Sequence, residues 1–155
     1  MLEGFSQGDI IWFNFPKEPK KPQYTIIGYH PALILHDDSQ PNKTVILSPL
    51  TKLHDKNGEE KELKSYHLVL RKKDYPQLDY DSYVKLDQIM TFSRHRVRDN
   101  SFICSLTDKD KAAAHLKLIE ALQMEDTIKE IVEKQLETTV KKVLNEYIKE
   151  LAKGS

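Results

Sequence analysis

The sequence has 155 residues, with 24 Lys and Arg against 24 Asp and Glu, and 31% of its residues are charged. That length fits one domain with room for a small appendage, and a net charge of zero excludes a global basic field, so nucleic-acid binding would need a local patch. The single cysteine excludes an internal disulfide. The absence of a signal-peptide pattern and of an apolar run near 18 residues predicts a cytoplasmic protein with no membrane segment.

Short strands are predicted over the first two thirds of the chain, where runs or alternations of Ile, Val, Leu and aromatic residues are bounded by turn residues. The predicted strands are residues 8–15, 31–37, 43–50, 65–71, 82–91 and 101–105. The proline-rich loop after the first strand contains Lys17. Pro49 in the third indicates a bulge or an edge position.

Helical spacing begins after Thr107 and Asp108, either of which is a candidate N-cap. The first helix is expected to end near Met124, and apolar residues three or four apart predict a second, amphipathic helix over 125–153. The sequence therefore predicts a mainly β barrel or sandwich capped by a helix, over residues 1–124, followed by a C-terminal helical extension, residues 125–155.

Three groups of polar side chains are candidates for chemistry. His30 is held extended by the proline that follows it, at the mouth of the predicted barrel. Ser48 and Thr51 stand at the end of the third strand, and Lys85 and Asp87 are two residues apart, so on a strand they share a face. Each group also has a simpler interpretation: a solvated histidine, a capping hydroxyl, or exposed charges that contribute less than about 1 kcal/mol.

Positive charge gathers locally after the fifth predicted strand. Arg94 and Arg96 alternate on a segment expected to be extended, so they would share a face that suits phosphate groups, although solvated surface arginines explain them equally well. Lys17 adds positive charge, and Tyr29 offers a ring for stacking on an RNA base. No metal site is predicted, because His36 has no second His or Cys at ligand spacing.

Four segments together resemble the MazF/PemK family of toxin endoribonucleases. The opening GDIIWFNFP is similar to the family's first strand, HPALILHDD to its second, and KTVILSPLTK to its third, which ends in a threonine. YVKLDQIMTFSRHRV is similar to the family's acidic-Gln-x-x-T strand and the basic segment after it. The resemblance covers residues 8–123 and depends on the order of the four segments more than on any one of them.

The resemblance implies a small SH3-like barrel that forms a homodimer and cleaves single-stranded RNA without a metal ion or other cofactor. The products would be a 2′,3′-cyclic phosphate and a 5′-hydroxyl, and an antitoxin from the same operon would cover the RNA groove. By position, Thr51 falls on the family's active-site threonine, Asp87 on an acid that serves as base in some members, and Lys85 on a proposed acid. Gln88 of the same motif and Ser48 are expected to contact the substrate.

The family usually has an arginine at the position of His30. A neutral imidazole cannot supply the fixed positive charge that would stabilise a pentacovalent phosphorane, but it can move a proton near neutral pH. We therefore expect His30 to act as acid or base when the RNA 2′-hydroxyl attacks the adjacent phosphate. The alternative is a barrel that has lost catalysis and serves as a binding module for nucleic acid or protein.

Residues 125–153 extend beyond the usual end of the family. A helix of 29 residues is about 43 Å long at 1.5 Å per residue, too long to pack wholly on a small barrel. We expect it to pair with its mate in a dimer or to dock elsewhere on the chain, with a partner-binding face as the alternative. Its even mixture of Glu and Lys disfavours a membrane-surface helix.

Overall fold

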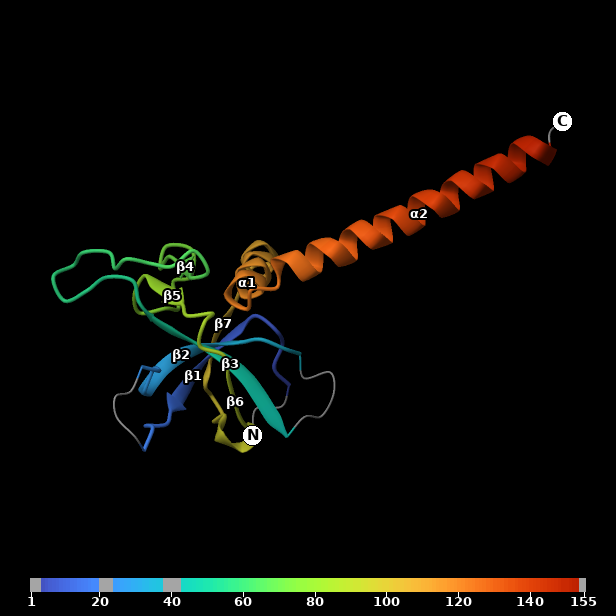
Figure 1. The fold of residues 1–155 in the computed structure, drawn as a ribbon. Coiled ribbons are helices and arrows are strands. Elements are labelled where there is room, and N and C mark those ends of the chain that lie inside the picture. Colours follow the sequence, from blue (N-terminus) through green and yellow to red (C-terminus); the bar gives the residue numbers. More distant parts are fainter. Residues whose placement is uncertain (1–3, 20–23, 38–42, 154–155) are drawn as a thin grey trace. The chain divides into compact units, whose positions relative to one another are not determined.

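The computed structural model describes residues 4–19, 24–37 and 43–153, and Figure 1 shows its elements in chain order. Among these residues the strands are β1 (Asp9–Phe15), β2 (Gly28–Ile34), β3 (Thr44–Lys52), β4 (Leu68–Leu70), β5 (Ser82–Val84), β6 (Met90–Ser93) and β7 (Phe102–Ser105). A 3-10 helix, η1 (Arg94–Arg96), precedes β7, and α1 (Asp108–Ala121) and α2 (Glu125–Lys153) follow it. The chain divides into two compact units, residues 1–121 and 122–155.

The first unit is a curled antiparallel sheet, a half-barrel, with α1 packed on one face. The strands follow the order β4-β5-β3-β2-β1-β7, and β6 pairs with the N-terminal half of β3. The prediction of a mainly β fold with C-terminal helices is confirmed. β3 is the central strand, because β2, β5 and β6 all pair with it.

Two buried cores lie on the two faces of this sheet, because side chains alternate along each strand. On one face Ile10 joins Leu50 and the α1 residue Ala114 in what we call the α1-side core. On the other face Phe13 joins Val45 and further phenylalanines in what we call the aromatic core. The alternation of side chains along β1 therefore separates the two cores.

The predicted strand over residues 82–91 is wrong, because a turn divides it. β5 ends at Val84, and the Gln88 amide donates to the Lys85 carbonyl over 2.8 Å, which closes the turn before β6 begins. The hydroxyl of Ser48 on β3 lies 3.2 Å from the Lys85 carbonyl and 3.1 Å from the Gln88 carbonyl. A side chain from the central strand therefore holds both ends of the turn.

The predicted N-cap of α1 is confirmed. The Asp110 amide donates to the Thr107 hydroxyl over 3.2 Å, which satisfies one of the free amides of the first turn. The Tyr75 hydroxyl donates to the Asp110 carboxylate over 2.5 Å and ties the loop after β4 to the helix. α1 ends earlier than expected, at Ala121, and Gln123 just beyond has a φ of 56°, the left-handed conformation that commonly ends helices.

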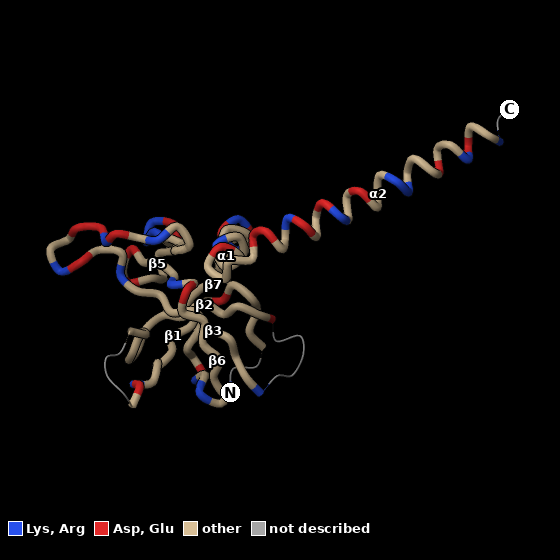
Figure 2. Tube along the Cα trace, viewed as in Figure 1, with Lys and Arg blue, Asp and Glu red and all other residues tan. Residues whose placement is uncertain are grey.

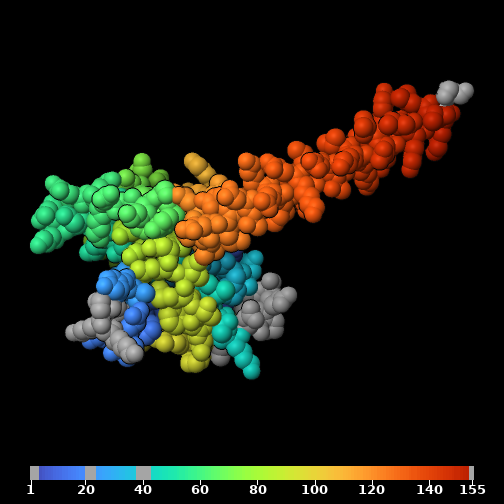
Figure 3. Space-filling view, viewed as in Figure 1, coloured from blue at the N-terminus to red at the C-terminus, as the bar shows by residue number. Residues whose placement is uncertain are grey.

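The second unit consists mainly of α2, a helix of 29 residues that is about 43 Å long. Figure 3 shows α2 as a continuous rod of side chains, coloured orange to red. Its large apolar side chains from Ile131 to Leu151 are 50–64% exposed. No helix among the described residues combines the length and the apolar character needed to cross a membrane.

Candidate functional site

β2 and β3 part before either strand ends. Their pairing stops at Ala32 opposite Pro49. β1 nevertheless stays paired with β2 as far as Gly28, and β5 stays paired with β3 as far as Lys52. The sheet therefore opens between two ribbons, β1–β2 and β3–β5–β4 (Figure 1). We call this opening the β2–β3 fork.

Pro31 explains where the fork begins. The amide of Trp12 donates to the carbonyl of Ser101 over 2.7 Å and so points away from β2. In an antiparallel pair the opposite residue, Pro31, then turns its own backbone away from β1 and towards β3. Because proline has no N–H, β2 offers no donor to Leu50 at this level, and the hydrogen-bond ladder ends.

A cavity of about 630 Å³ occupies the fork, within the range of roughly 300–1,000 Å³ that is usual for ligand sites. Three successive residues of each strand line it, residues 29–31 of β2 and residues 50–52 of β3, together with Trp12 of β1. The rest of the wall comes mainly from the loops that precede β4 and β5. The parting of the strands therefore creates the cavity.

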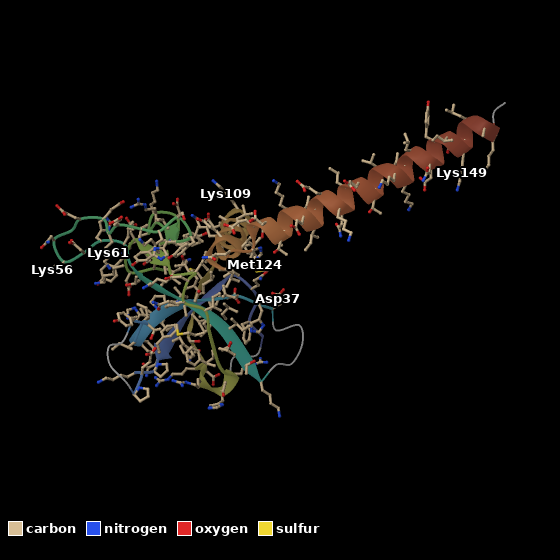
Figure 4. All side chains as sticks on the ribbon, in the orientation of Figure 1. Asp37, Lys56, Lys61, Lys109, Met124 and Lys149 are labelled. Carbon is tan, nitrogen blue, oxygen red and sulfur yellow. The ribbon has the colours of Figure 1, made fainter. Side chains whose placement is uncertain are left out.

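The wall of the cavity is basic. It contains Lys52, Lys56 and Lys61 against Asp55 and Asp79, and Figure 4 shows Lys56 and Lys61 on the long loop after β3. The Asp55 carboxylate accepts two backbone amides of its own loop, over 2.8 and 3.0 Å, and these hold its pKa below the usual value. Asp55 therefore stays ionised, and the wall has three lysine charges against two carboxylates, a small excess of positive charge.

Aromatic rings line the same cavity. The rings of Trp12 and Tyr29 stack with an interplanar angle of 2° and a centroid distance of 5.4 Å. Tyr29 and Tyr80 are each 52% exposed, and the Lys52 ammonium lies 3.7 Å from the centre of the Tyr80 ring. Exposed rings beside lysines are what single-stranded nucleic acids bind, because bases stack on the rings and phosphates pair with the cations.

His30 and Thr51 both line this cavity. Ala32 pairs with Pro49 across the two strands, and residues two apart on a strand share a face, so His30 and Thr51 belong to the same face of the sheet. Both side chains are partly buried. An imidazole and a hydroxyl therefore stand on the facing strands of the fork.

Asp87 and Lys85 do not line the cavity. They lie in the turn after β5, so the expectation that they project together from one strand face is wrong. The Asp87 carboxylate Oδ1 instead lies 3.3 Å from His67 Nε2, and the His67 ring packs on Tyr83 at 4.9 Å between centroids. Tyr83 is the β5 partner of Thr51, so Tyr83 stands between Thr51 and the His67–Asp87 pair.

His67 is a candidate that sequence reasoning missed. Its side chain is only 8% exposed, and this burial lowers the pKa of His67 below its usual 6.5, while the charge and hydrogen bond of Asp87 oppose the shift. The available signal was its position in the alternating segment before β4, between the apolar residues Tyr66 and Leu68. A histidine on the polar face of such a segment is titratable and partly enclosed.

The side chains of Ser48 and Gln88 form hydrogen bonds with the backbone of the protein itself. Ser48 is 0% exposed, and its hydroxyl contacts the turn after β5. The side-chain amide of Gln88 donates to the Tyr24 carbonyl over 3.1 Å and accepts from the Ile26 amide over 3.0 Å. Neither residue lines the cavity; they fix the turn and the loop before β2.

The arginines of the basic segment lie in η1, so the expected extended segment with one arginine face is wrong. The Arg94 guanidinium lies 5.2 Å from the centre of the Phe5 ring, and that of Arg96 lies 5.2 Å from the Phe92 ring. Neither arginine lines the cavity, and neither does Lys17, which is exposed just after β1.

The described part of the chain contains neither a reactive cysteine nor a cluster of metal ligands. Cys104 is buried in the α1-side core, and burial raises the pKa of its thiol, so it behaves as a small apolar side chain. Within residues 4–19, 24–37 and 43–153, no three His, Cys, Asp or Glu side chains gather closely enough to hold a metal ion.

Solved structures define the class to which this half-barrel belongs. MazF from Deinococcus radiodurans is 17% identical with a TM-score of 0.59, over 79% of this chain and 99% of that chain. The Mycobacterium tuberculosis toxin MazF-mt6 is 15% identical with a TM-score of 0.53, over 75% and 97%. An endoribonuclease from a mycobacterial species, in complex with its cognate antitoxin, is 17% identical with a TM-score of 0.54, over 77% and 95%. The first unit therefore has a MazF-like fold.

The sequence identifies the family. Residues 6–122 match the family described as PemK-like, MazF-like toxin of type II toxin-antitoxin system, and the chain belongs to this family of endoribonuclease toxins. A search of curated proteins found no match. The matched region ends at residue 122, so α2 lies beyond it.

Proposed function

We propose that the chain is an endoribonuclease that cleaves single-stranded RNA without a metal ion, as the toxin of a toxin–antitoxin pair in the cytoplasm. Membership of the family supports the reaction class. The observation that supports the site is that His30 and Thr51 line one basic, aromatic cavity in the β2–β3 fork. The products would be a 2′,3′-cyclic phosphate and a 5′-hydroxyl.

The cavity suits single-stranded RNA as a substrate. A base can stack on the exposed ring of Tyr29, which Trp12 supports from behind. Lys52 and Lys61 provide cations for the phosphates on either side. A double helix would keep its bases stacked inside and could not use these rings, so the site favours an unpaired segment.

His30 and Thr51 are assigned to the reaction itself. The 2′-oxygen of the RNA attacks the adjacent phosphorus, a new O2′–P bond forms, and the P–O5′ bond breaks. A base must accept the 2′-hydroxyl proton and an acid must protonate the leaving 5′-oxygen. His30 can serve as one of these groups, because an imidazole exchanges protons near neutral pH, while the Thr51 hydroxyl positions the phosphate.

Asp87 is assigned to the second proton transfer, with Lys85 as the alternative acid. The Tyr83 ring lies between Thr51 and Asp87. RNA bound at Thr51 must therefore extend across the Tyr83 ring to reach Asp87. His67 is then a positioning residue, because its ring nitrogen holds the Asp87 carboxylate. The substrate path would run from the fork over Tyr83 to the turn after β5.

The decisive experiment treats a defined pool of RNA with the purified protein and sequences the cleaved ends. Cleavage with 2′,3′-cyclic phosphate ends, in chelator as well as in magnesium, is the expected result. His30→Ala should lower the cleavage rate by about 10²–10⁴-fold, the usual value of one acid or base. Lys109→Ala, on the exposed surface of α1, is the matched control. Unchanged cleavage by His30→Ala would refute its assignment.

A binding module without catalysis is the second candidate. The observation that favours it is that Asp87 and Lys85 do not line the cavity that contains His30. This candidate predicts tight RNA binding, no cleavage under any condition, and harmless expression in a bacterial host. The enzyme predicts growth arrest that His30→Ala relieves.

An antitoxin and a second toxin copy are the proposed protein partners. The mycobacterial endoribonuclease was solved in complex with its cognate antitoxin, and a Deinococcus radiodurans MazF was solved together with MazE. For this chain we propose that an antitoxin covers the fork and that the half-barrel forms a homodimer. Co-expression with the neighbouring open reading frame should suppress toxicity if the first proposal is correct.

A further inference from the structure

α2 presents a long apolar stripe at its surface. Nine large apolar side chains from Ile131 to Leu151 are each 50–64% exposed in the single chain, and all except Ile131 lie on one side of the helix: Val132, Leu136, Val140, Val143, Leu144, Tyr147, Ile148 and Leu151. Most of the stability of a helix in water comes from packing such a face against another surface. An amphipathic helix of this length therefore needs an apolar partner.

The spacing of the stripe suits a straight helical partner. Its central residues recur at intervals of 4, 4, 3, 4 and 4, at Val132, Leu136, Val140, Val143, Tyr147 and Leu151. This is an 11-residue repeat of about 3.67 residues per turn, close to the 3.6 of an α-helix, so the stripe stays nearly parallel to the helix axis. Such a stripe can pack along its whole length on a second helix.

The stripe is self-complementary when the helix is reversed. Reversal about the point between Thr139 and Val140 places apolar residues at the levels of apolar residues: Ile128 with Leu151, Val132 with Tyr147, and Leu136 with Val143. An interface between identical chains related by a two-fold axis requires this self-complementarity. An arbitrary partner does not require it.

The charges of α2 favour the same reversed arrangement. Residues 125–139 contain five acidic and two basic residues, a net charge of −3, whereas residues 140–153 contain four basic and two acidic residues, a net charge of +2 (Figure 2). An antiparallel pair sets each negative half beside a positive half, while a parallel pair sets like halves together. The helix dipole does not explain this asymmetry, because Glu137 and Lys142 lie far from the terminal turns where it acts.

The charges of individual residue pairs also favour the antiparallel arrangement. Here a level means two residues, one from each helix, at the same height along the pair. Five levels of the reversed pair hold a charged residue on both helices. Four of the five combine opposite charges, Asp126 with Lys153, Lys129 with Glu150, Glu130 with Lys149, and Glu137 with Lys142, and one combines Glu133 with Glu146.

We propose that α2 is a dimerisation helix that pairs antiparallel with α2 of a second copy of this chain, through the stripe centred on Val140. This contact is separate from the half-barrel, because α2 lies beyond the matched residues 6–122. It is also independent of whether the chain cleaves RNA.

Disulfide cross-linking of the full-length protein tests the pairing and its direction. In a Cys104→Ala background, Val132→Cys and Tyr147→Cys are made as two separate proteins. Antiparallel pairing places these positions at one level, so oxidation of the mixture should give a cross-linked dimer that contains one copy of each. Neither protein alone should cross-link well, because its own two cysteines would be about 22 Å apart along the axis. Val140→Cys, near the centre, should cross-link with itself.

The other outcomes overturn the proposal. Efficient self-cross-linking of Val132→Cys would show a parallel pair, and no cross-linking of the mixture or of Val140→Cys would show that another surface covers the stripe. A check of the face uses the self-cross-link of Val140→Cys: adding Leu136→Glu should abolish the cross-link, and adding Asn145→Glu, on the opposite face of α2, should leave it unchanged. RNA cleavage measured on Leu136→Glu separates the failure of this proposal from the failure of the proposed function.

Discussion

His67 Nε2 lies 3.3 Å from Asp87 Oδ1, and the same imidazole packs against the ring of Tyr83. The carboxylate raises the affinity of the imidazole for a proton, but burial lowers it further, so the pKa of His67 stays below 6.5. The pair therefore joins a neutral, enclosed histidine to a more exposed carboxylate. That combination makes the folded state sensitive to acid.

The stability of the half-barrel should fall as the pH drops below about 6.5, the usual pKa of histidine in an unfolded chain. In that range the unfolded chain binds a proton at His67 that the folded chain does not bind, so the free energy of unfolding decreases. Urea unfolding at pH 7.5, 6.5 and 5.5 measures the effect. His67→Gln should flatten the dependence, and His115→Gln, on the exposed surface of α1, should keep it. Equal slopes in all three proteins would contradict the assignment.

Ser48→Ala should destabilise the half-barrel by about 1–3 kcal/mol, because the carbonyls of Lys85 and Gln88 would lose a buried donor. The turn that holds Asp87 would loosen as well. Chemical denaturation measures the change in unfolding free energy. Ser93→Ala is the control, since Ser93 is exposed and its side chain makes no capping hydrogen bond. A loss no larger than that of the control would show that the hydroxyl does not hold the turn.

Pro31→Ala should extend the pairing of β2 and β3 by one residue pair, residue 31 with Leu50. The new amide at position 31 would face Leu50 and complete the ladder, so the fork would begin later and the cavity would narrow. We expect slow hydrogen exchange at that amide together with weaker RNA binding. Pro16→Ala, at the exposed end of β1, should change neither. Fast exchange at residue 31 would mean that the strands are held apart by something other than the proline.

Lys61→Ala should weaken RNA binding at all sequences to a similar extent, since a lysine binds phosphates rather than base edges. For a single strand, removing one lysine–phosphate interaction should reduce the slope of log affinity against log salt by about 0.7. Fluorescence anisotropy over a salt series measures both quantities, with Lys109→Ala as the control. An unchanged slope would place the phosphate backbone away from the loop after β3.

Sequence reasoning located the N-cap at Thr107 and most of β1, β2 and β3. It placed His30 in the loop before its strand and Thr51 just beyond the third strand, whereas β2 and β3 extend to include them. It failed at residues 82–91 because Leu86 continues the apolar alternation of Val84 while lying in a turn, where it is still fully buried. The Ser48 hydroxyl, which contacts both ends of this turn, comes from another part of the chain. No local pattern in the sequence reports such an interaction.

Sequence reasoning also failed for Arg94, Arg96 and the His67–Asp87 pair, because their partners come from distant parts of the chain. The guanidinium of Arg96 packs on Phe92 and donates to the Asn14 carbonyl over 3.3 Å, and these partners meet only when the sheet curls. His67 and Asp87 are twenty residues apart and become neighbours through the pairing of β4 with β5. Side chains whose environment depends on sheet curvature are beyond what spacing along one strand can predict.

Because consecutive residues of β1 and of β2 pack into opposite cores, and β3 contributes to both, neither core can melt while the other keeps its shape. Ile10 and Ile11 are consecutive, yet each belongs to a different core. The half-barrel should accordingly unfold in a single cooperative step, and its central amides should exchange with solvent only when the whole sheet opens.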